Sequence, residues 1–567
     1  MENKLNKRER YKAQLKPIDY YKDFEDIDFE SLNEADRFYL QDFGIFNTNF
    51  LEDEFTIRIR IPGGKISASN FQKIADIVDE YDLTIILTAR GGIQLHDVEA
   101  ENVLEIHKRI NALGVSTWQS FGDNVRNIIT DAYDGCGEFS EIETYPLVMA
   151  MHDYIIENPR YVGMLPRRIS VGISGNRSNV SSFFANDLYF ALAKKDGVFG
   201  FNVYVGGKNT DVAQNADIFL LQSEVFNFFK AFIETFYIHG SRFSRAKTRI
   251  FHMIEEIGID AIKSLIIHEY KSNFQSQGET IFEKTKFTEF HKLKNGKYGF
   301  CYQTDFSRLK SDEIKNIASY ATENSLEIRL GMDQNIYLIG LDEPSTTLKS
   351  QALSSTIVAC AGNLCPYAVW NIKDETSYLP LEKINEHSIQ VGFSGCAKGC
   401  GRHMHTDIGL IGLKTNNFGD TDGGARIFIG ASHSDGASAG RQLFSMVPFI
   451  HLDSVVSLAI KFFELSSYSD FEEFATKIFN NYSEEFVSLW FLANLETDKS
   501  IELLRMDSAT TFEYEVELLK KEFSELDFWE HIGENFHDAI SYLSKKLWTI
   551  EGEDPRYTPK IDRVNFR

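Results

Sequence analysis

The sequence predicts an α+β protein with an internal duplication and two further α/β segments. A helix–strand–turn–strand pattern occupies residues 55–98 and returns at residues 306–342. Apolar strand-like runs alternate with amphipathic helical segments between the two copies and again after the second copy. The 567-residue chain is long enough for two to four domains. It contains no long Pro- or Ser-rich linker, so we expect the domains to pack together.

The repeated unit follows from residue periodicity. After polar helical segments in residues 1–45, FTIRIRIPGG (55–64) alternates apolar and cationic residues and stops at Pro-Gly-Gly, which predicts a strand and a turn. NFQKIADIVDEY (70–81) has helical periodicity, and LTIILTARGGIQLHDV (83–98) reads as two strands around a Gly-Gly turn. LTIILTARGGIQL (83–95) aligns without a gap with LEIRLGMDQNIYL (326–338). This match predicts a duplication.

Two α/β segments complete the predicted fold. In the first, LPRRISVGISG (165–175) and GFNVYVGG (200–207) indicate strands, and QSEVFNFFKAFIETFYIHG (222–240) indicates a helix. In the second, IGLIGL (408–413) and RIFIGA (426–431) indicate strands. The last ninety or so residues, rich in Glu, Phe and Leu, are predicted to be helical.

Composition restricts the class of protein. With 59 basic and 83 acidic residues the net charge is −24, which argues against nucleic-acid binding. Six cysteines do not make a disulfide framework in so long a chain, so we expect a reducing compartment. The charged segment 1–16 has no apolar core and resembles neither a signal peptide nor a twin-arginine leader. No run of 18 apolar residues occurs, so we expect a cytoplasmic protein without a membrane span.

Four cysteines in two close pairs predict a metal centre. Cys360 and Cys365 stand in CAGNLC, and thirty residues later Cys396 and Cys400 stand in SGCAKGC. Spacing alone fits a four-thiolate zinc site as well as an iron–sulfur cluster. Glycines at 362, 395, 399 and 401 favour the cluster, because they let backbone N–H groups approach its sulfurs. Cys136 and Cys301 stand apart and are interpreted as small apolar residues of the core.

Arginines beside predicted turns and strand ends indicate an internal anion site. They are Arg58, Arg60, Arg90, Arg126, Arg167 and Arg168. Guanidinium groups suit this role because their charge is permanent and they bind oxyanions through two N–H groups. A further basic run contains Arg242, Arg245, Lys247 and Arg249. It is open to three interpretations: a solvated helix face, contacts to cofactor carboxylates, or a docking patch for an acidic electron donor.

These segments, in this order, resemble the sirohaem and [4Fe–4S] sulfite/nitrite reductase family from about Phe55 to about Phe449. The elements that carry the resemblance are RIRIPGG, TARGGIQLH, DNVRNIITD, LPRRIS, GFNVYVGG, RLGMDQN and the cysteine pairs followed by DIGLIG. The resemblance implies duplicated ferredoxin-like halves plus two α/β domains that bind sirohaem and the cluster. The domain ranges we predict are 1–45 (helical lead), 46–135 (first half), 136–290 (sirohaem-binding α/β), 291–345 (second half), 346–475 ([4Fe–4S]/sirohaem α/β) and 476–567 (helical extension).

The resemblance also implies roles for individual residues. Cys360, Cys365, Cys396 and Cys400 would bind the cluster, and Cys400 would in addition bind the sirohaem iron. Arg58, Arg126 and Arg168 would face the substrate, with Ser170 at the position of a further active-site cation. The residues that match sirohaem-contacting positions are Thr88, Arg90, Gln94, Arg167, Gln334 and Arg402.

The chain departs from the family pattern at several positions. The first cysteine pair is C-x4-C where the family usually has C-x5-C. The family's LPRK-x-K reads Leu-Pro-Arg167-Arg168-Ile169-Ser170, so arginine and serine replace two lysines. Gly92 and Gly331 stand where threonine is frequent, and Lys398 stands where asparagine is common. These departures affect substrate choice and proton delivery more than cofactor binding.

The implied activity is a six-electron reduction at a coupled sirohaem/[4Fe–4S] centre. The main expectation is sulfite to sulfide, since ITDAYDG and GRH-x-x-x-DIG resemble bacterial sulfite-reductase-type members. The alternative is ferredoxin-dependent reduction of nitrite to ammonia, since CAGN resembles plant-type nitrite enzymes and the lost cation suits a monoanion. A corrin-ring-forming iron–sulfur enzyme and a zinc-stapled binding protein are remote alternatives. With no flavin or nicotinamide fingerprint, the electrons would come from ferredoxin or a separate flavoprotein.

Overall fold

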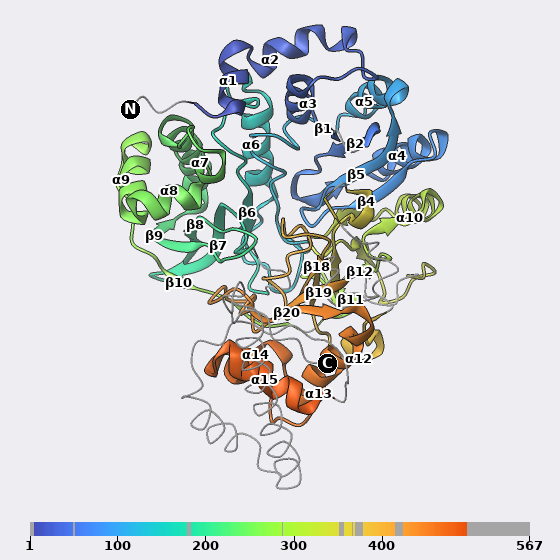
Figure 1. The fold of residues 1–567 in the computed structure, drawn as a ribbon, viewed down its shortest axis with the longest axis vertical. Helices are drawn as coiled ribbons and strands as arrows, with labels where there is room; N and C mark the ends of the chain where they lie inside the picture. The colour runs from blue at the N-terminus through green and yellow to red at the C-terminus, as the bar shows by residue number, and fades with distance from the viewer. Residues whose placement is uncertain are drawn as a thin grey trace, which may run out of the picture. The chain divides into compact units, whose positions relative to one another are not determined.

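A computed structural model describes residues 5–48, 51–178, 183–285, 287–350, 356–365, 367–368, 378–413 and 423–495 (Figure 1). Contacts between residues divide the chain into two compact units, Met1–Ser355 and Thr356–Arg567. Among the described residues, no helix combines the length and the apolar character that crossing a bilayer requires.

The first unit begins with short helices, as predicted for residues 1–45. They are α1 (Lys7–Gln14), α2 (Pro17–Tyr20) and α3 (Glu34–Leu40). Asn6 and Asn33 cap α1 and α3, because each side-chain oxygen accepts backbone N–H groups of the first turn. The buried residues Phe38, Tyr39 and Leu40 then anchor α3 in the core.

The duplication is confirmed by two sheets of the same design. The first has the order β1 (Ile45–Thr48), β2 (Leu51–Ile59), β5 (Ile93–Glu99), β4 (Thr84–Leu87), β13 (Arg308–Leu309). The second has the order β11 (Phe290–Lys292), β12 (Tyr298–Tyr302), β15 (Ile336–Leu341), β14 (Glu327–Leu330), β3 (Lys65–Ile66). Each sheet thus receives a two-residue strand from the other copy, β13 on β4 and β3 on β14. The halves are interlocked by this exchange.

The helices of the two halves pack against each other. They are α4 (Ala68–Glu80) and α10 (Ser311–Glu323), and the first half adds α5 (Val103–Ala112). The buried face of α4 carries Phe71, Ile74, Ile77 and Val78, at the helical spacing read from the sequence. These residues belong to one apolar core with the inward residues of both sheets.

A third sheet follows in the same unit. Its order is β10 (Glu279–Thr280), β7 (Leu188–Lys195), β8 (Val198–Val205), β9 (Gln214–Leu220), and β6 (Val171–Ser174) runs parallel to β7. The helices α7 (Gln222–His239) and α9 (Ile259–Tyr270) pack on β9, while α6 (Tyr145–Ile156) contacts α7 and α8 (Ile250–Ile257) contacts α9 (Figure 1). Segment 125–129 forms parallel bridges to residues 169 and 172, and so lies beside the start of β6.

The described residues of the second unit form a sheet of order β16 (Ile357–Ala359), β17 (Val391–Ser394), β18 (Ile408–Leu413), β19 (Gly424–Ile429), β20 (Arg441–Pro448). The first three strands are parallel and the last two antiparallel. The helices are α12 (Leu381–Glu386), α13 (Leu452–Glu464), α14 (Phe471–Ile478) and α15 (Glu484–Asn494). Phe462 of α13 stacks on Trp490 of α15 with ring centroids 4.0 Å apart.

The predicted fold class, α+β with duplicated ferredoxin-like halves and α/β parts, is therefore confirmed. Within the last ninety or so residues, predicted to be helical, the structure describes the helix α15, and the part of the prediction from residue 496 on lies outside the described residues.

Candidate active site

Two adjacent parallel strands bring the two cysteine pairs to one edge of the second unit's sheet. Cys360 follows β16 directly, and Cys396 lies two residues after β17. Because the strands are parallel, their carboxyl ends meet at the same edge. The backbone N–H of Cys360 donates to the Phe393 carbonyl at 3.0 Å, which joins the two strand ends.

Cys400 lies within electrostatic reach of each of the other three thiols. Burial raises the pKa of Cys360 to about 12, and the neighbouring Cys400 adds to this rise. Burial also raises the pKa of Cys365 and of Cys396, and again Cys400 contributes. Crowded thiols of this kind release their protons when a metal binds, since metal coordination requires the thiolate form.

Backbone N–H groups are already directed at one of these sulfurs. Gly362 and Gly395 donate to Cys360 Sγ at 3.3 and 3.1 Å. Such N–H groups lower the energy of a thiolate and tune an iron–sulfur cluster. The donor set therefore fits a four-thiolate iron–sulfur cluster. Of the four glycines singled out in the sequence, Gly362 and Gly395 donate to a sulfur, whereas the N–H groups of Gly399 and Gly401 donate to the Cys396 carbonyl and to Ser394 Oγ.

The short C-x4-C spacing is accommodated by a tight turn. Residues Gly362–Leu364 form a single 3-10 turn, and the N–H of Cys365 donates to the Gly362 carbonyl at 2.9 Å. Gly362 has a φ of +61°, which glycine adopts without strain. The turn brings Cys365 close enough to Cys396 and Cys400 to interact with their charges.

The loop after Cys400 is held on its own sheet. Ser394 Oγ accepts the Gly401 N–H at 3.0 Å and lies 3.0 Å from His403 Nδ1. A Cβ at Gly401 would lie 2.3 Å from the Phe393 carbonyl oxygen, so this position requires glycine. Arg402, predicted to contact sirohaem, is 8% exposed and has a φ of +57° in this loop.

A cluster of arginines, Arg58, Arg90, Arg126 and Arg168, forms in the first unit. Burial lowers the pKa of Arg126 well below its usual range, and Arg58, Arg168 and Arg90 lower it further in that order. The four side chains come from β2, the β4–β5 turn and the two adjacent segments around residues 126 and 168. Like charges brought this close create a strongly positive site for an anion.

Phe121 and Ser120 organise the cluster. The Arg58 guanidinium lies 3.8 Å from the centroid of the Phe121 ring, and that of Arg126 lies 5.8 Å from it. Both guanidinium groups donate to the Ser120 carbonyl, Arg58 at 3.3 Å. The ring face and the carbonyl offset part of the repulsion between the two cations. Neither residue was predicted, because an aromatic next to a serine carries no signal of this role in a sequence.

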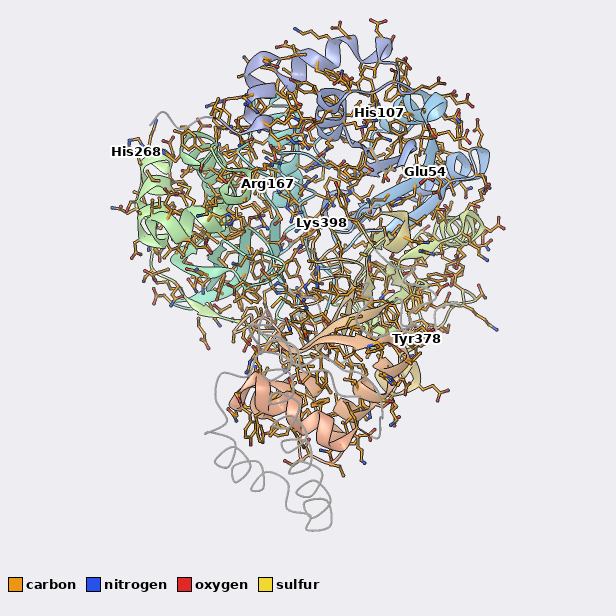
Figure 2. The ribbon with its side chains drawn as sticks, in the orientation of Figure 1. Glu54, His107, Arg167, His268, Tyr378 and Lys398 are labelled. Atoms are coloured by element: carbon orange, nitrogen blue, oxygen red, sulfur yellow. The ribbon has the colours of Figure 1, made fainter. Side chains whose placement is uncertain are left out.

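Arg167 and Arg168 follow Pro166 on the neighbouring segment. Arg167 (labelled in Figure 2) is half-buried, and burial lowers its pKa to about 10, with Arg245 contributing. Ser170 is buried, and its hydroxyl donates to Asp187 Oδ2 at 2.6 Å. Asp187 in turn pairs with Arg249 at 2.7 Å. Ser170 is thus bound to a carboxylate that Arg249 already neutralises.

Arg60, which was grouped with Arg58 in the sequence, has a different environment. Its side chain is fully buried, and burial lowers its pKa to about 9. The guanidinium donates to the carbonyls of Gln119, Val125 and Arg126 at 3.2, 2.7 and 3.2 Å. Arg60 therefore holds the backbone of the segment that presents Arg126.

The other predicted sirohaem contacts gather at the β4–β5 turn. Thr88 Oγ1 accepts the N–H groups of Arg90 and Gly92 at 3.3 and 3.1 Å. Gln94 pairs across the sheet with Arg58. Gln334 comes from the second half, and its amide donates to the Leu87 carbonyl at 2.8 Å. Thr88, Arg90, Gln94 and Gln334 are thereby brought together beside the arginine cluster.

The two glycines that replace threonine are explained by their neighbours. A Cβ at Gly331 would lie 2.1 Å from Asp333 Oδ1 and 2.6 Å from the Tyr337 ring. A Cβ at Gly92 would lie 2.9 Å from the Ile59 carbonyl oxygen. In this chain, other groups fill the space that a larger side chain would need. Of the two cysteines set apart from the pairs, Cys301 is fully buried as predicted and Cys136 is partly buried.

The basic run of residues 242–249 is directed inward. Arg242 pairs with Glu9, Arg245 with Asp123 and Arg249 with Asp187, at 2.6, 2.6 and 2.7 Å, and the three carboxylates are buried. Of the four cations in this run, only Lys247 is exposed. Three of the four cations therefore serve internal ion pairs. Buried acids such as Asp123 and Asp187 were not predicted, because their sequence context does not distinguish them from surface acids.

Two family models match parts of this chain. The family model described as "Nitrite/Sulfite reductase ferredoxin-like half domain" matches residues 51–113. The model described as "Nitrite and sulphite reductase 4Fe-4S domain" matches residues 121–274, the part that carries Arg126 and Arg168.

Curated relatives align along most of the chain. The ferredoxin–nitrite reductase of Synechococcus elongatus is 29% identical over 489 residues, covering 80% of this chain and 95% of the relative. The enzyme of the same name from Leptolyngbya laminosa is 26% identical, covering 79% and 94%. The assimilatory ferredoxin-dependent nitrite reductase of Haloferax mediterranei is 25% identical, covering 81% and 89%.

A solved structure, the Mycobacterium tuberculosis NirA protein, has the same fold with a TM-score of 0.73 at 22% identity, covering 85% of this chain and 97% of that one. The sequence matches and this shared fold lead to one conclusion: the chain belongs to the nitrite and sulfite reductase family, oxidoreductases that use a [4Fe–4S] cluster and sirohaem.

Proposed function

We propose that this chain reduces nitrite to ammonia with electrons from ferredoxin. The observation that carries the proposal is the similarity, over about 80% of the chain, to enzymes named ferredoxin–nitrite reductase. Sulfite, the main expectation from the sequence, becomes the second candidate, because these relatives favour the nitrite alternative.

The proposed site residues divide into those that would hold the cluster, those that would hold sirohaem and those that would bind the substrate anion. Cys360, Cys365, Cys396 and Cys400 would hold the cluster, with Cys400 also binding the sirohaem iron. Thr88, Arg90, Gln94, Arg167, Gln334 and Arg402 would hold sirohaem, whose carboxylates suit cationic and amide donors. When bound, the cluster would supply single electrons and sirohaem would supply an iron to which nitrite can bind.

The reaction consumes six electrons and eight protons per nitrite, and it yields one ammonium ion and two waters. Arg58, Arg126 and Arg168 would bind the anion and stabilise the negative charge that gathers on its oxygens as electrons arrive. Because arginine does not give up its proton, these residues act as electrostatic donors of hydrogen bonds rather than as acids.

The state of Ser170 supports a monoanion as substrate. The second lysine of the family's LPRK-x-K pattern, at the position of Ser170, would add a mobile charge and a proton donor to the site. Here the hydroxyl donates to Asp187, and Asp187 is paired with Arg249. Ser170 therefore adds no positive charge, and the protons would arrive through water rather than from this side chain.

The experiment is a product assay with the purified holoenzyme under anaerobic conditions. Reduced ferredoxin or a chemical reductant supplies electrons, and ammonium and oxidised donor are both measured. We expect one ammonium for each nitrite and six one-electron donors oxidised. Release of nitric oxide as the main product, or no consumption of nitrite, would overturn the proposal.

A further inference from the structure

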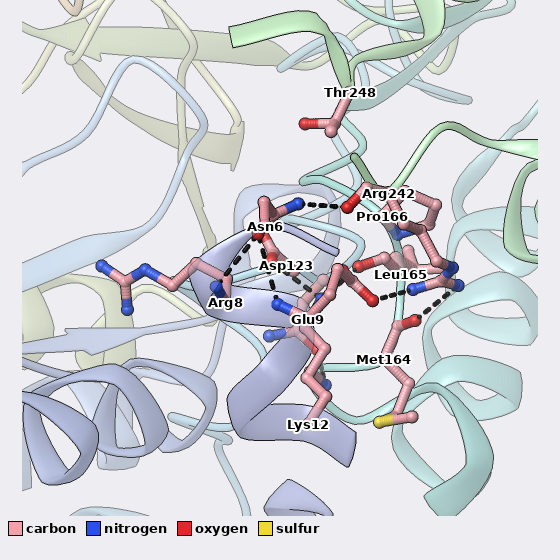
Figure 3. Close-up of polar contacts among 12 residues, drawn as sticks. Asn6, Arg8, Glu9, Lys12, Asp123, Met164, Leu165, Pro166, Arg242 and Thr248 are labelled. Atoms are coloured by element: carbon pink, nitrogen blue, oxygen red, sulfur yellow. Dashed lines mark hydrogen bonds and ion pairs between the residues drawn. The ribbon is translucent and has the colours of Figure 1, made fainter. Parts of the chain in front are cut away.

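We propose that Lys12, in the N-terminal helix α1, is a positioning residue for the arginine cluster. Its ammonium ties the segment that carries Arg126 to the segment that carries Arg167 and Arg168 (Figure 3). The inference rests on the proposed role of this cluster as the anion site. It gives a function to a helix that precedes the residues matched by the family models.

The Lys12 ammonium has a complete set of acceptors. Its Nζ lies 2.7 Å from Glu9 Oε1, 2.7 Å from the Leu165 carbonyl and 2.9 Å from Asp123 Oδ2. The side chains of Lys12, Glu9 and Asp123 are 2%, 5% and 0% exposed. An ammonium has three N–H donors, so each one is used, which is what a buried cation requires.

The acceptors belong to the two segments that present the arginines. Asp123 precedes Arg126 by three residues, and Leu165 is followed by Pro166, Arg167 and Arg168. Backbone bonds join the same segments further on, from Arg126 N–H to the Ile169 carbonyl at 2.7 Å and from Ile169 N–H to the Asn124 carbonyl at 2.9 Å. At the Pro166 end, the N–H of Leu165 donates to the Asp123 carbonyl at 3.3 Å, and the Lys12 side chain adds a second connection through the Leu165 carbonyl and the Asp123 carboxylate.

Lys12 also affects the charge state of the arginines, through the carboxylate of Asp123. Burial alone would raise the pKa of Asp123, but the charges of Lys12 and Arg245 outweigh it and keep the pKa below its usual value. The resulting carboxylate favours the charged forms of Arg126 and Arg167. Loss of the ammonium would leave Asp123 and Glu9 buried with one cation fewer, and the two segments would separate or change their charge state.

Helix α1 is fixed in place by contacts of its first turn. Asn6 caps the helix, and its Nδ2 donates to the Arg242 carbonyl at 2.7 Å. Arg242 pairs back to Glu9 Oε2 at 2.6 Å (Figure 3). The contacts with Arg242 thus hold the helix from which Lys12 reaches Asp123. Lys7, at the exposed start of the same helix, pairs with Glu34 instead.

The test compares Lys12→Met, Lys12→Gln and Lys12→Arg with Lys7→Met in the holoenzyme. Lys7 lies on the same helix and makes an exposed pair with Glu34, so Lys7→Met is a matched change without the buried contacts. Each variant is titrated with nitrite and, separately, with sulfite, and binding is followed by the visible spectrum of the resting enzyme. Steady-state kcat and KM are measured alongside, and thermal unfolding reports the structural effect.

We expect Lys12→Met and Lys12→Gln to weaken binding of the anion and raise its KM by about tenfold, the size of a lost charge-assisted bond. Lys12→Arg should recover most of the affinity, and Lys7→Met should match the wild type. If both neutral variants keep the wild-type Kd and KM while only their thermal stability falls, Lys12 is a structural anchor and the inference is wrong. Lys12→Gln decides the question if Lys12→Met does not fold. A wild type that binds neither anion would instead refute the proposed function, and the inference with it.

Discussion

At the scale of residues, the central finding is that the arginines fall into two groups with different tasks. Arg58, Arg90, Arg126 and Arg168 lie close enough to affect each other's charge. Arg60 and Arg245 make backbone or carboxylate contacts that hold the first group in place. The distinction follows from the acceptors that Arg60 and Arg245 find, three backbone carbonyls for Arg60 and a buried carboxylate for Arg245.

Replacement of Arg126 by Met tests the first group. The change keeps an unbranched apolar stem and removes the guanidinium with its charge, so we expect kcat/KM for the substrate anion to fall by about 100-fold, the scale of one lost charge-stabilising donor. Arg109→Met is the control, because Arg109 of α5 forms a partly exposed pair with Glu80 of α4. Equal activity in both variants would remove Arg126 from the site.

Asp42 provides a prediction of pH dependence. It is fully buried beside Asn124, and burial followed by the charge of Asp123 raises its pKa to about 7, while Lys12 and Arg126 act in the opposite direction. Because the unfolded chain loses this proton near pH 4, the folded state holds an extra proton between about pH 4 and 7. The stability that Asp42 contributes is therefore complete below pH 4 and is lost as the pH rises to about 7.

The Asp42→Asn variant should show this directly. The amide stays neutral, so the variant should be more stable than the wild type at pH 8, and the difference should shrink toward pH 4. Denaturant unfolding at several pH values measures it. A difference that stays constant over this range would mean that Asp42 does not titrate in the folded protein.

At the scale of elements, the exchange of β3 and β13 between the ferredoxin-like halves is the feature that joins them. Gly64 lies between the end of β2 and β3, has a φ of +75°, and a Cβ there would lie 2.1 Å from the Leu330 carbonyl oxygen of β14. The close approach of these two backbones is possible only without a side chain.

Gly64→Ala should therefore weaken the interlocked sheets. We expect a loss of roughly 2 kcal/mol or more in the free energy of unfolding, from the backbone strain and the steric overlap together. Gly114→Ala measures the backbone strain alone, because Gly114 also has a positive φ, +81°, but nothing lies within 4 Å of its Cβ position. The difference between the two variants is then the cost of the steric overlap. If the two variants lose the same stability, the contact with β14 is not what requires glycine.

The elements also show what a sequence can and cannot predict. The pattern of LTIILTARGGIQL and its partner predicted both hairpins, because alternation of apolar residues is a local property. The strand exchange was not predictable, since β3 and β13 have two residues each and no periodicity. The same limit applies to Lys12, because nothing in its local sequence distinguishes it from Lys7. The cysteine pairs could be predicted as a metal centre because their spacing along the sequence is itself the evidence.

At the scale of the whole molecule, the chain combines a net charge of −24 with an internal cationic site. The basic run at 242–249, considered as a docking patch for an electron donor, is largely neutralised by Glu9, Asp123 and Asp187. Its role is to fix the segments around the arginine cluster. The arginine cluster is thus a local concentration of positive charge within a chain of negative net charge.

The central claim is that this site is matched to nitrite. The most direct measurement is kcat/KM for nitrite and for sulfite, determined side by side with the same chemical reductant and the same preparation of holoenzyme. The account predicts a clearly higher value for nitrite, since Ser170 adds no charge to the site. A higher value for sulfite would contradict it and restore sulfite reduction as the main activity of this chain.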